Sequence, residues 1–277
     1  MKKISRRSFM AAAAVSVAAL AMTACGGSAS SASSVASSAA SSEAVSSAAA
    51  AELTTVEAGK LTMATNAAFP PYEMTTDAGE FEGIDVDTAK AIAEKLGLEL
   101  QIDDMDFDAA LLSVQQGKAD IVMAGVTVTD ERKAVMDFSD SYATGIQSII
   151  VPEGSDIASP DDLAGKKIGT QRGTTGYIYC SDDFGDDSVV AYDDGLTAVQ
   201  ALNNGQVDAV VIDNAPAKEF VAANPGLVIL DTSYAEEDYA IGMAKGSSLE
   251  DAVNAALEEL KADGTLQSIV DKYITAE

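Results

Sequence analysis

The chain has 277 residues, of which 47% are hydrophobic and 5% aromatic, a composition typical of a soluble protein with a sizeable core. Its 17 basic and 44 acidic residues give a formal net charge of −27. A surface this acidic repels phosphate backbones, which argues against nucleic acid as a partner. The sequence has no His, which excludes Ser-His triads and His metal ligands, and Cys25 and Cys180 are too few for a disulfide scaffold or a thiolate metal site. We therefore expect no metal and no cofactor.

Residues 1–24 have the pattern of a secretory signal peptide, with a basic start, an apolar run over 9–22 and small residues before Cys25. The apolar run is too short and too rich in Ala for a typical membrane-spanning helix. The sequence MTACG around Cys25 resembles a lipobox. It predicts that Cys25 becomes the lipidated first residue of the mature protein, on the outer face of the cytoplasmic membrane. An uncleaved anchor and cleavage without lipidation are the alternatives, and the pair Arg6-Arg7 is compatible with either Sec or twin-arginine export.

A segment of low complexity follows the predicted signal. Residues 26–52 are almost entirely Ser and Ala, and such a segment cannot bury enough apolar surface to become ordered. We predict that 25–59 comprises the lipidated Cys and a disordered tether, with a docked helix as the alternative.

Strand and helix patterns alternate from residue 60 to the end of the chain. Apolar and alternating runs predict strands at 60–65, 98–102, 120–126, 147–151, 167–170, 189–192, 207–212, 227–230 and 239–244. Capping residues and helical spacing predict helices after Asp85, Asp106 or Asp108, Thr129, Ser159, Asp194, Asp213 and Ser248, a helix that begins at Tyr177, and a last helix over 266–273. This alternation predicts an α/β fold with parallel sheets, and roughly 220 ordered residues exceed one compact unit, which predicts two lobes.

Arg132 is the first candidate binding residue, because it stands in the first turn of the helix that opens after Thr129. The positive end of a helix dipole disfavours a cation there, so Arg132 needs a compensating partner. A bound carboxylate suits it well, since helix N-termini bind anions and a guanidinium donates two parallel hydrogen bonds. The alternative is a surface Arg paired with Asp130 or Glu131.

Three other features favour a site at strand ends. The turn over 171–176 (QRGTTG) reads as a second helix N-terminus able to bind an anion, or as an ordinary capped turn. Asp213 ends an apolar strand where open α/β sheets place ligand contacts, although it could simply cap the next helix. Phe69 stands on a loop fixed by two prolines, as a core residue or as the wall of a cleft.

Seven segments, in order from about residue 60 to the end, resemble the solute-binding proteins of amino-acid ABC importers, in the polar amino-acid group. They are TNAAFPPYE (65–73), GIDVDTAKAIAEKLG (83–97), MDFDAALLSVQQGKADI (105–121), AGVTVTDERKAVMDFSDSY (124–142), GTQRGTTG (169–176), NNGQVDAVVIDNAPA (203–217) and DGTLQSIVDKY (263–273). The resemblance implies a two-lobed clamp of the type II periplasmic-binding-protein kind. Each lobe would be a mixed or parallel sheet flanked by helices, with two crossover hinge strands between the lobes. Lobe 1 would comprise 60–146 plus 241–277, and lobe 2 would comprise 147–240.

The resemblance also implies a role for each predicted site residue. Arg132 would bind the α-carboxylate of an amino acid, and Asp213 would bind its α-ammonium. Gly125 and Thr127, through backbone and hydroxyl, and the amides of Thr174 and Thr175 would assist with the carboxylate. The ligand side chain would lie between Phe69 and Phe107. Asn66, Ala124 and Gln171 complete the predicted site.

Two positions bear on the choice of amino acid. Asn66 replaces an Asp that is frequent in members that take a basic or amide side chain, whereas Gln171 resembles binders of basic amino acids. We expect arginine or lysine first and glutamine second, with Glu73 or Asp106 as a possible counter-charge.

The implied function is that of a monomeric extracytoplasmic receptor that delivers a polar L-amino acid to an ABC permease in the membrane and is not an enzyme. The alternatives are an enzyme on the same fold, such as a cyclohexadienyl dehydratase-like lyase, and a sensory binding protein.

Overall fold

A computed structural model of the protein describes residues 53–274. The predicted signal peptide, Cys25 and the predicted tether as far as residue 52 lie outside the described residues. The end of that predicted tether, 53–59, lies within them, and there the backbone N–H of Val56 donates to Asp120 at 2.7 Å. None of the helices within 53–274 combines the length and the apolar character that a membrane crossing requires.

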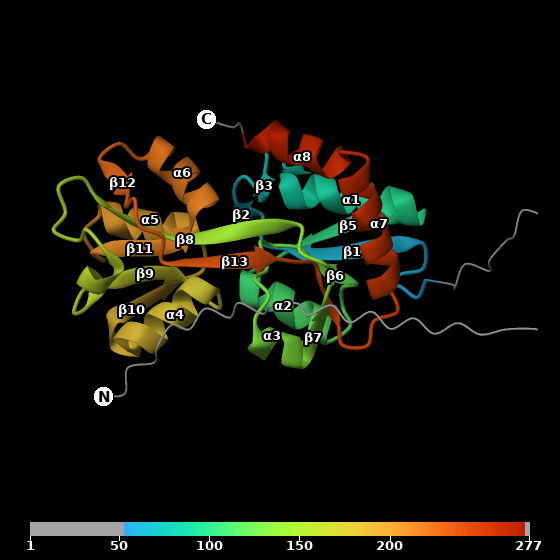
Figure 1. The fold of residues 1–277 in the computed structure, drawn as a ribbon, viewed down its shortest axis with the longest axis horizontal. Helices are drawn as coiled ribbons and strands as arrows, with labels where there is room; N and C mark the ends of the chain where they lie inside the picture. Colours follow the sequence, from blue (N-terminus) through green and yellow to red (C-terminus); the bar gives the residue numbers. More distant parts are fainter. Residues whose placement is uncertain (1–52, 275–277) are drawn as a thin grey trace, which may run out of the picture. The chain divides into compact units, whose positions relative to one another are not determined.

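Two large sheets organise the described residues (Figure 1). The first has the order β5-β1-β6-β14-β7, formed by Glu99–Asp104, Lys60–Thr65, Ile121–Val122, Gly242–Ala244 and Met136–Phe138. The second has the order β10-β9-β11-β8-β12, formed by Val189–Tyr192, Ile168–Gln171, Ala209–Asp213, Ala143–Pro152 and Leu227–Ile229, and β13 (Ala235–Tyr239) also pairs with β8. A small third sheet joins β2 (Ala68–Phe69), β3 (Glu73–Thr75) and β4 (Phe81–Glu82).

Both large sheets are mixed. In the first, β1 runs parallel to β5 and β6, whereas β14 runs antiparallel to β6 and β7. In the second, β9 runs parallel to β10 and β11, whereas β8 runs antiparallel to β11, β12 and β13. The predicted α/β class with two lobes is confirmed. The first lobe is the one built on the first sheet, and the second lobe is the one built on the second sheet.

Helices cover the sheets of both lobes (Figure 1). In the first lobe these are α1 (Ile84–Leu96), α2 (Phe107–Gln115), α3 (Asp130–Val135), α7 (Glu250–Ala262) and α8 (Thr265–Tyr273). In the second lobe they are α4 (Thr175–Phe184), α5 (Gly195–Asn203) and α6 (Asn214–Ala223), with short 3₁₀ turns at Pro160–Leu163 and Asp186–Ser188.

Strand β11 shows why the second sheet is covered on both faces. Its sequence AVVID is buried at every position. Side chains alternate along a strand, so Val210 packs in the same hydrophobic cluster as residues of α5 and α6, whereas Val211 packs in a cluster with Cys180 of α4. A continuous apolar strand therefore ends at Asp213, an acid held at the edge of a two-sided core.

The start of α1 differs from the prediction that Asp85 caps it. The helix begins at Ile84 with Gly83 in the N-cap position, and Asp85 lies in its first turn, fully buried. Gly83 has a φ of 133°, and a Cβ there would lie 2.1 Å from the carbonyl oxygen of Tyr72. The close approach of β3 to the start of α1 therefore requires glycine.

Two strands, β8 and β13, connect the lobes (Figure 1). They pair antiparallel from Ala143↔Tyr239 to Gln147↔Ala235. Further along, β8 pairs with β11, while the chain leaves β13 and enters β14 of the first sheet within three residues. The strand predicted over 239–244 is therefore two strands in different sheets. The two predicted crossover strands are present, and the lobe boundaries at 146/147 and 240/241 stay a prediction.

Candidate ligand-binding site

One cavity between the two lobes is lined by all of the residues predicted from the sequence to bind the ligand, and Glu73 lines it with them. The residues from the first lobe are Asn66, Phe69, Glu73, Phe107, Ala124, Gly125, Thr127 and Arg132, and those from the second lobe are Gln171, Thr174, Thr175 and Asp213. Most of them stand where a strand ends or a helix begins, which is where open α/β sheets place their ligands.

Arg132 is buried in this cavity, with 8% of its surface exposed. Thr129 caps α3 and its hydroxyl accepts from the backbone N–H of Arg132 at 3.1 Å, as the sequence predicted. The guanidinium donates through Nη1 to the Thr127 carbonyl at 2.8 Å and through Nη2 to the Gly173 carbonyl of the second lobe at 3.1 Å. Its Cζ lies 5.4 Å from the ring centre of Phe107. The alternative of a surface Arg is therefore wrong.

The nearby acids compensate the positive charge of the buried Arg132 side chain only in part. Burial lowers the pKa of its guanidinium, and the nearby carboxylates of Glu237 and Asp213 raise it. A guanidinium has five N–H donors, and the two carbonyls use two of them. The remaining donors are available to an anion in the cavity.

The turn before α4 supplies a second group of donors. The Thr174 hydroxyl accepts from the backbone N–H of Tyr177 at 3.3 Å and donates to the Gln171 carbonyl at 2.8 Å. It therefore caps α4, which begins at Thr175, two residues before the predicted start at Tyr177. The first N–H groups of any helix have no acceptor within the helix. In α4 the free backbone N–H groups start with that of Thr175, the first residue of the helix, and Thr175 lines the cavity. This end of the cavity can therefore also hold an anion.

Asp213 does not act as a helix cap. It occupies the N-cap position of α6, but its side chain makes no capping bond. Its carboxylate accepts from Nε2 of Gln147 at 2.9 Å and from the hydroxyl of Tyr239. Burial raises the pKa of Asp213 to about 6. An ammonium in the cavity would meet this buried carboxylate.

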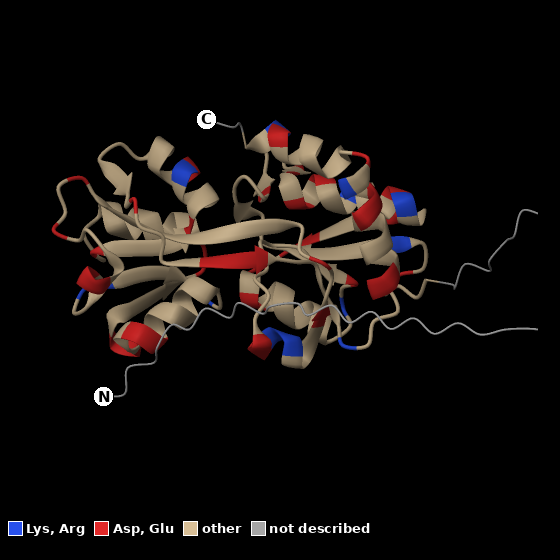
Figure 2. Ribbon diagram, viewed as in Figure 1, with Lys and Arg blue, Asp and Glu red and all other residues tan. Residues whose placement is uncertain are grey.

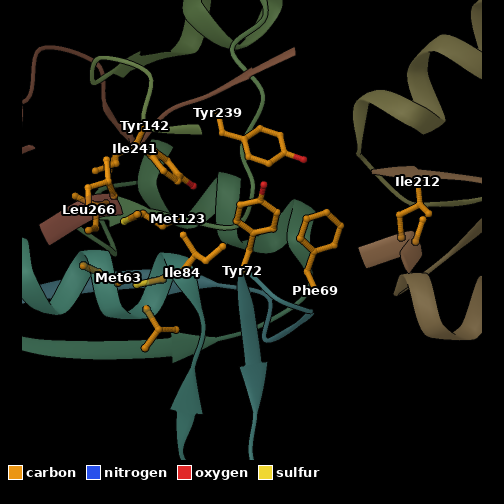
Figure 3. Packing of buried hydrophobic residues seen from close by; sticks show 14 of the residues in the cluster. Met63, Phe69, Tyr72, Ile84, Met123, Tyr142, Ile212, Tyr239, Ile241 and Leu266 are labelled. Carbon is orange, nitrogen blue, oxygen red and sulfur yellow. The ribbon is translucent and has the colours of Figure 1, made fainter. Parts of the chain in front are cut away.

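Aromatic rings form part of the cavity wall. Phe69 stacks on Tyr72 with 5.9 Å between ring centres, and Tyr72 meets Tyr239 edge to face at 5.3 Å (Figure 3). Phe69 is thus both a core residue and a wall residue, so the two readings of its sequence position hold together. Phe107 lies against the Arg132 guanidinium.

A neutral amide pair bridges the lobes at another part of the wall. Gln171 donates through Nε2 to Oδ1 of Asn66 at 2.8 Å and to the Asp193 carbonyl at 3.2 Å. Asn66 donates through Nδ2 to the Met105 carbonyl at 2.9 Å. The two positions that bear on ligand choice therefore hydrogen-bond to each other across the cavity.

Two buried acids support the wall near Gly125. Asp85 accepts from the Gly125 backbone N–H at 3.0 Å and from the Tyr142 hydroxyl at 2.7 Å, and burial raises its pKa to about 6. Glu73 is fully buried, and within 53–274 neither of its carboxyl oxygens accepts a hydrogen bond from a donor group. Burial and the neighbouring Asp85 raise the pKa of Glu73 well above its ordinary value. A protonated Glu73 beside an ionised Asp85 is the arrangement that suits this site.

Sequence reasoning found Glu73 only as a possible counter-charge and did not find Asp85, Gln147, Glu237 or Tyr239 as neighbours of the site. The signal for Glu73 was available in an acid that directly follows an apolar, Pro-fixed loop. The other four take their places through contacts with residues at least 26 positions away in the chain.

Residues 61–276 match the bacterial extracellular solute-binding proteins, family 3. The chain belongs to this family. Its two-lobed fold, with crossover strands and a cavity between the lobes, is the one that the resemblance implied.

Relatives of this family 3 protein extend over most of the chain. It is 32% identical over 274 residues to a probable histidine-binding protein of Neisseria gonorrhoeae, covering 96% of this chain and 95% of that one. It is similar to the structure of the arginine-, lysine-, histidine-binding protein ArtJ of Geobacillus stearothermophilus, with 35% identity and a TM-score of 0.75. The match covers 79% of this chain and 96% of that one. It is also similar to the structure of an ancestral arginine-binding protein bound to glutamine, with 42% identity and a TM-score of 0.75. That match covers 79% of this chain and 99% of the other.

The buried carboxyl of Glu73 predicts how stability depends on pH. A carboxyl whose pKa is raised on folding stabilises the native state fully only below its ordinary value of 4.5, and this contribution is lost as pH rises through the folded pKa. Glu73→Gln keeps the shape of the protonated acid and cannot ionise. At about pH 8 we expect the free energy of unfolding of the variant to exceed that of wild type by about 1–3 kcal/mol. We expect this difference to shrink as the pH is lowered toward about 4.5.

The control for this prediction is Glu80→Gln, since Glu80 is exposed on the loop after β3. Urea unfolding of the three proteins between about pH 4.5 and pH 8 is the measurement. Parallel pH profiles for wild type and Glu73→Gln would contradict the buried, protonated state of Glu73.

Proposed function

We propose that this family 3 protein binds a polar L-amino acid in the cavity between its lobes and delivers it to an ABC permease. The observation that carries the proposal is that Arg132 and Asp213 line the same cavity, one with free guanidinium donors and one with a buried carboxylate. A guanidinium recognises a carboxylate and a carboxylate recognises an ammonium. The two ends of an amino-acid zwitterion thus have their partners, with aromatic rings beside them.

We propose arginine or lysine as the first choice of ligand. Three buried carboxylates, Asp85, Asp213 and Glu237, lie in or directly behind the wall of the cavity, and among residues 53–274 the one buried cation is Arg132. A ligand that adds a positive charge is favoured in such a site. ArtJ of Geobacillus stearothermophilus is named for binding arginine, lysine and histidine, which supports this choice.

Glutamine is the second choice. The Asn66–Gln171 pair offers amide donors and acceptors without charge, and these match an amide side chain. The ancestral arginine-binding protein, which is similar to this chain, was solved with glutamine bound, and this supports the second choice.

We infer that the protein is a receptor and not a lyase or other enzyme on the same fold. The relatives compared above are named as binding proteins. Arg132 and Asp213 are placed to hold both ends of a zwitterion at rest, which is what capture and release require. A sensory receptor would use the same pocket, and transport is preferred because the family is one of solute-binding proteins.

The location proposed for the protein is the outer face of the cytoplasmic membrane, where a lipid on Cys25 would hold a monomer close to its permease. A lipid anchor leaves the binding lobes on the aqueous side and keeps them near the transporter.

A panel of the standard amino acids in a thermal-shift assay tests the binding proposal. Ligand at 100 times its dissociation constant stabilises a protein by about 2.7 kcal/mol. We expect arginine or lysine to give the largest rise in the melting temperature, followed by glutamine. A panel in which no amino acid raises the melting temperature would sink the proposal.

Arg132→Lys tests the carboxylate partner. Lysine keeps the charge but cannot donate two parallel hydrogen bonds, so we expect affinity for the best amino acid of the panel to fall about tenfold or more in a calorimetric titration. Arg172→Lys is the matched control, because Arg172 is half-exposed and pairs with Asp193 at the surface. Equal affinity of Arg132→Lys and wild type would remove Arg132 from the site.

Cys25→Ala tests the anchor. Without the thiol the protein cannot be acylated, so we expect it to move from the membrane fraction to the soluble fraction of cells that express it. Cys180→Ala is the matched control, since Cys180 is buried in α4 and is expected to leave fractionation unchanged. Retention of Cys25→Ala on membranes would indicate an uncleaved anchor instead.

A further inference from the structure

Glu237 is a buried acid of β13 that does not line the cavity and that the sequence did not mark. Strand β13 reads AEEDY, with three acids in a row (Figure 2). Side chains alternate along the strand, so Glu236 and Asp238 are exposed, whereas Glu237 is 7% exposed. An acid of this kind is retained in a core only when donors surround it.

The donors that surround Glu237 come from both lobes and from the other crossover strand. Its Oε2 accepts from the hydroxyl of Thr175 at 2.9 Å and from the hydroxyl of Thr127 at 3.3 Å. It also accepts from Nε2 of Gln147 in β8 at 3.1 Å. Thr127 and Thr175 both line the cavity, so Glu237 lies directly behind two of its wall residues.

The hydrogen bonds to Glu237 determine whether the hydroxyls of Thr127 and Thr175 can donate to a ligand or can only accept from it. A hydroxyl has one proton to donate and two lone pairs to accept with, whereas a carboxylate only accepts. When Thr127 and Thr175 donate to Glu237, they have no proton left for a ligand carboxylate. They present lone pairs to the cavity, and lone pairs accept from N–H groups.

The acceptor atoms of this region form one continuous group. Nε2 of Gln147 donates to Asp213 at 2.9 Å as well as to Glu237, and it lies 3.4 Å from the hydroxyl oxygen of Thr175. The hydroxyl oxygens of Thr127 and Thr175 are 3.5 Å apart. Asp213, Thr175 and Thr127 therefore follow one another along the wall, with Gln147 and Glu237 behind them.

Two buried oxygens in the same group have no hydrogen-bond partner among residues 53–274. They are Oε1 of Glu237 and Oε1 of Gln147. An unpaired buried acceptor destabilises the folded state. The group around Asp213 therefore holds more acceptor oxygens than donors, which favours a donor-rich ligand group such as an ammonium beside Asp213, Thr127 and Thr175.

We propose that Glu237 is a positioning residue for the ligand's α-ammonium. Its carboxylate accepts hydrogen bonds from the hydroxyls of Thr127 and Thr175. Both hydroxyl oxygens can then accept from the ammonium, as Asp213 does. The ligand carboxylate is then bound by Arg132 and by backbone N–H groups, and the Thr127 hydroxyl expected to assist it has the opposite role. The inference rests on the proposed function, in that it requires an amino acid as the ligand.

The test compares ligands with and without the α-ammonium. L-Arginine is paired with 5-guanidinopentanoate, and L-glutamine with glutaramate, each analogue lacking only the amino group. Dissociation constants are measured by calorimetry, with displacement titrations for weak analogues, for wild type, Glu237→Gln and Glu236→Gln. Glu236 is the neighbouring exposed acid and serves as the matched control.

We expect Glu237→Gln to weaken the binding of the amino acid by about tenfold while changing that of its analogue less than about twofold, because a neutral amide oxygen accepts from the two hydroxyls less strongly than a carboxylate and the negative charge behind the ammonium is removed. Glu236→Gln should leave all constants unchanged. Thr175→Val, which removes one hydroxyl, should show the same selective loss and serves if Glu237→Gln folds poorly.

Three results would overturn the inference. Unchanged affinities in Glu237→Gln would show that it has no part in binding. An equal loss for amino acid and analogue would show that Glu237 only holds the lobes together. A wild-type protein that binds neither L-arginine nor L-glutamine, nor any amino acid in the panel, would overturn the proposed function as well, which separates the two failures.

Discussion

The burial of the Arg132 guanidinium between the lobes is the constraint on which the site depends. A charge taken out of water is costly unless hydrogen bonds and opposite charges compensate it. Compensation comes from the Thr127 carbonyl in the first lobe, from the Gly173 carbonyl in the second and from the Phe107 ring. One side chain therefore ties the loop after β6 to the turn before α4. The same side chain keeps donors free for an anion in the cavity.

The acids of the site are arranged around donors that belong to the frame of the molecule. Asp85 takes its hydrogen bonds from Gly125, in the cavity wall, and from Tyr142, just before β8. Asp213 takes its hydrogen bonds from Gln147 of β8 and Tyr239 of β13. Each acid thus connects the wall of the cavity to a crossover strand or its approach. Asp213 is therefore hydrogen-bonded to both of the strands that join the lobes.

Local signals in the sequence were reliable where local chemistry decides the structure. Thr129 and Asp194 were expected to precede helices because a side-chain oxygen at that position satisfies a free N–H, and both cap their helices. Asp85 looked like the same kind of cap and is not one. A capping acid and a buried acid have the same local sequence, and the partners of Asp85 are 40 and 57 residues away. The predicted strand 239–244 was divided for a similar reason, because the chain passes from β13 in one sheet to β14 in another.

The sequence by itself determined the α/β class, the alternation of elements and the residues that gather at strand ends, since these follow from periodicity, capping and the rule that such ends share an edge. Only the tertiary structure decided which acid of Glu236, Glu237 and Asp238 faces the site. All three are acids next to one another in the sequence, and nothing local shows which of them is buried. The pairing of Glu237 with Gly145 fixes the register of the strand. A slip of one residue would turn every side chain of β13 to the other face. Register depends on contacts between strands some 90 residues apart, and no local pattern carries that information.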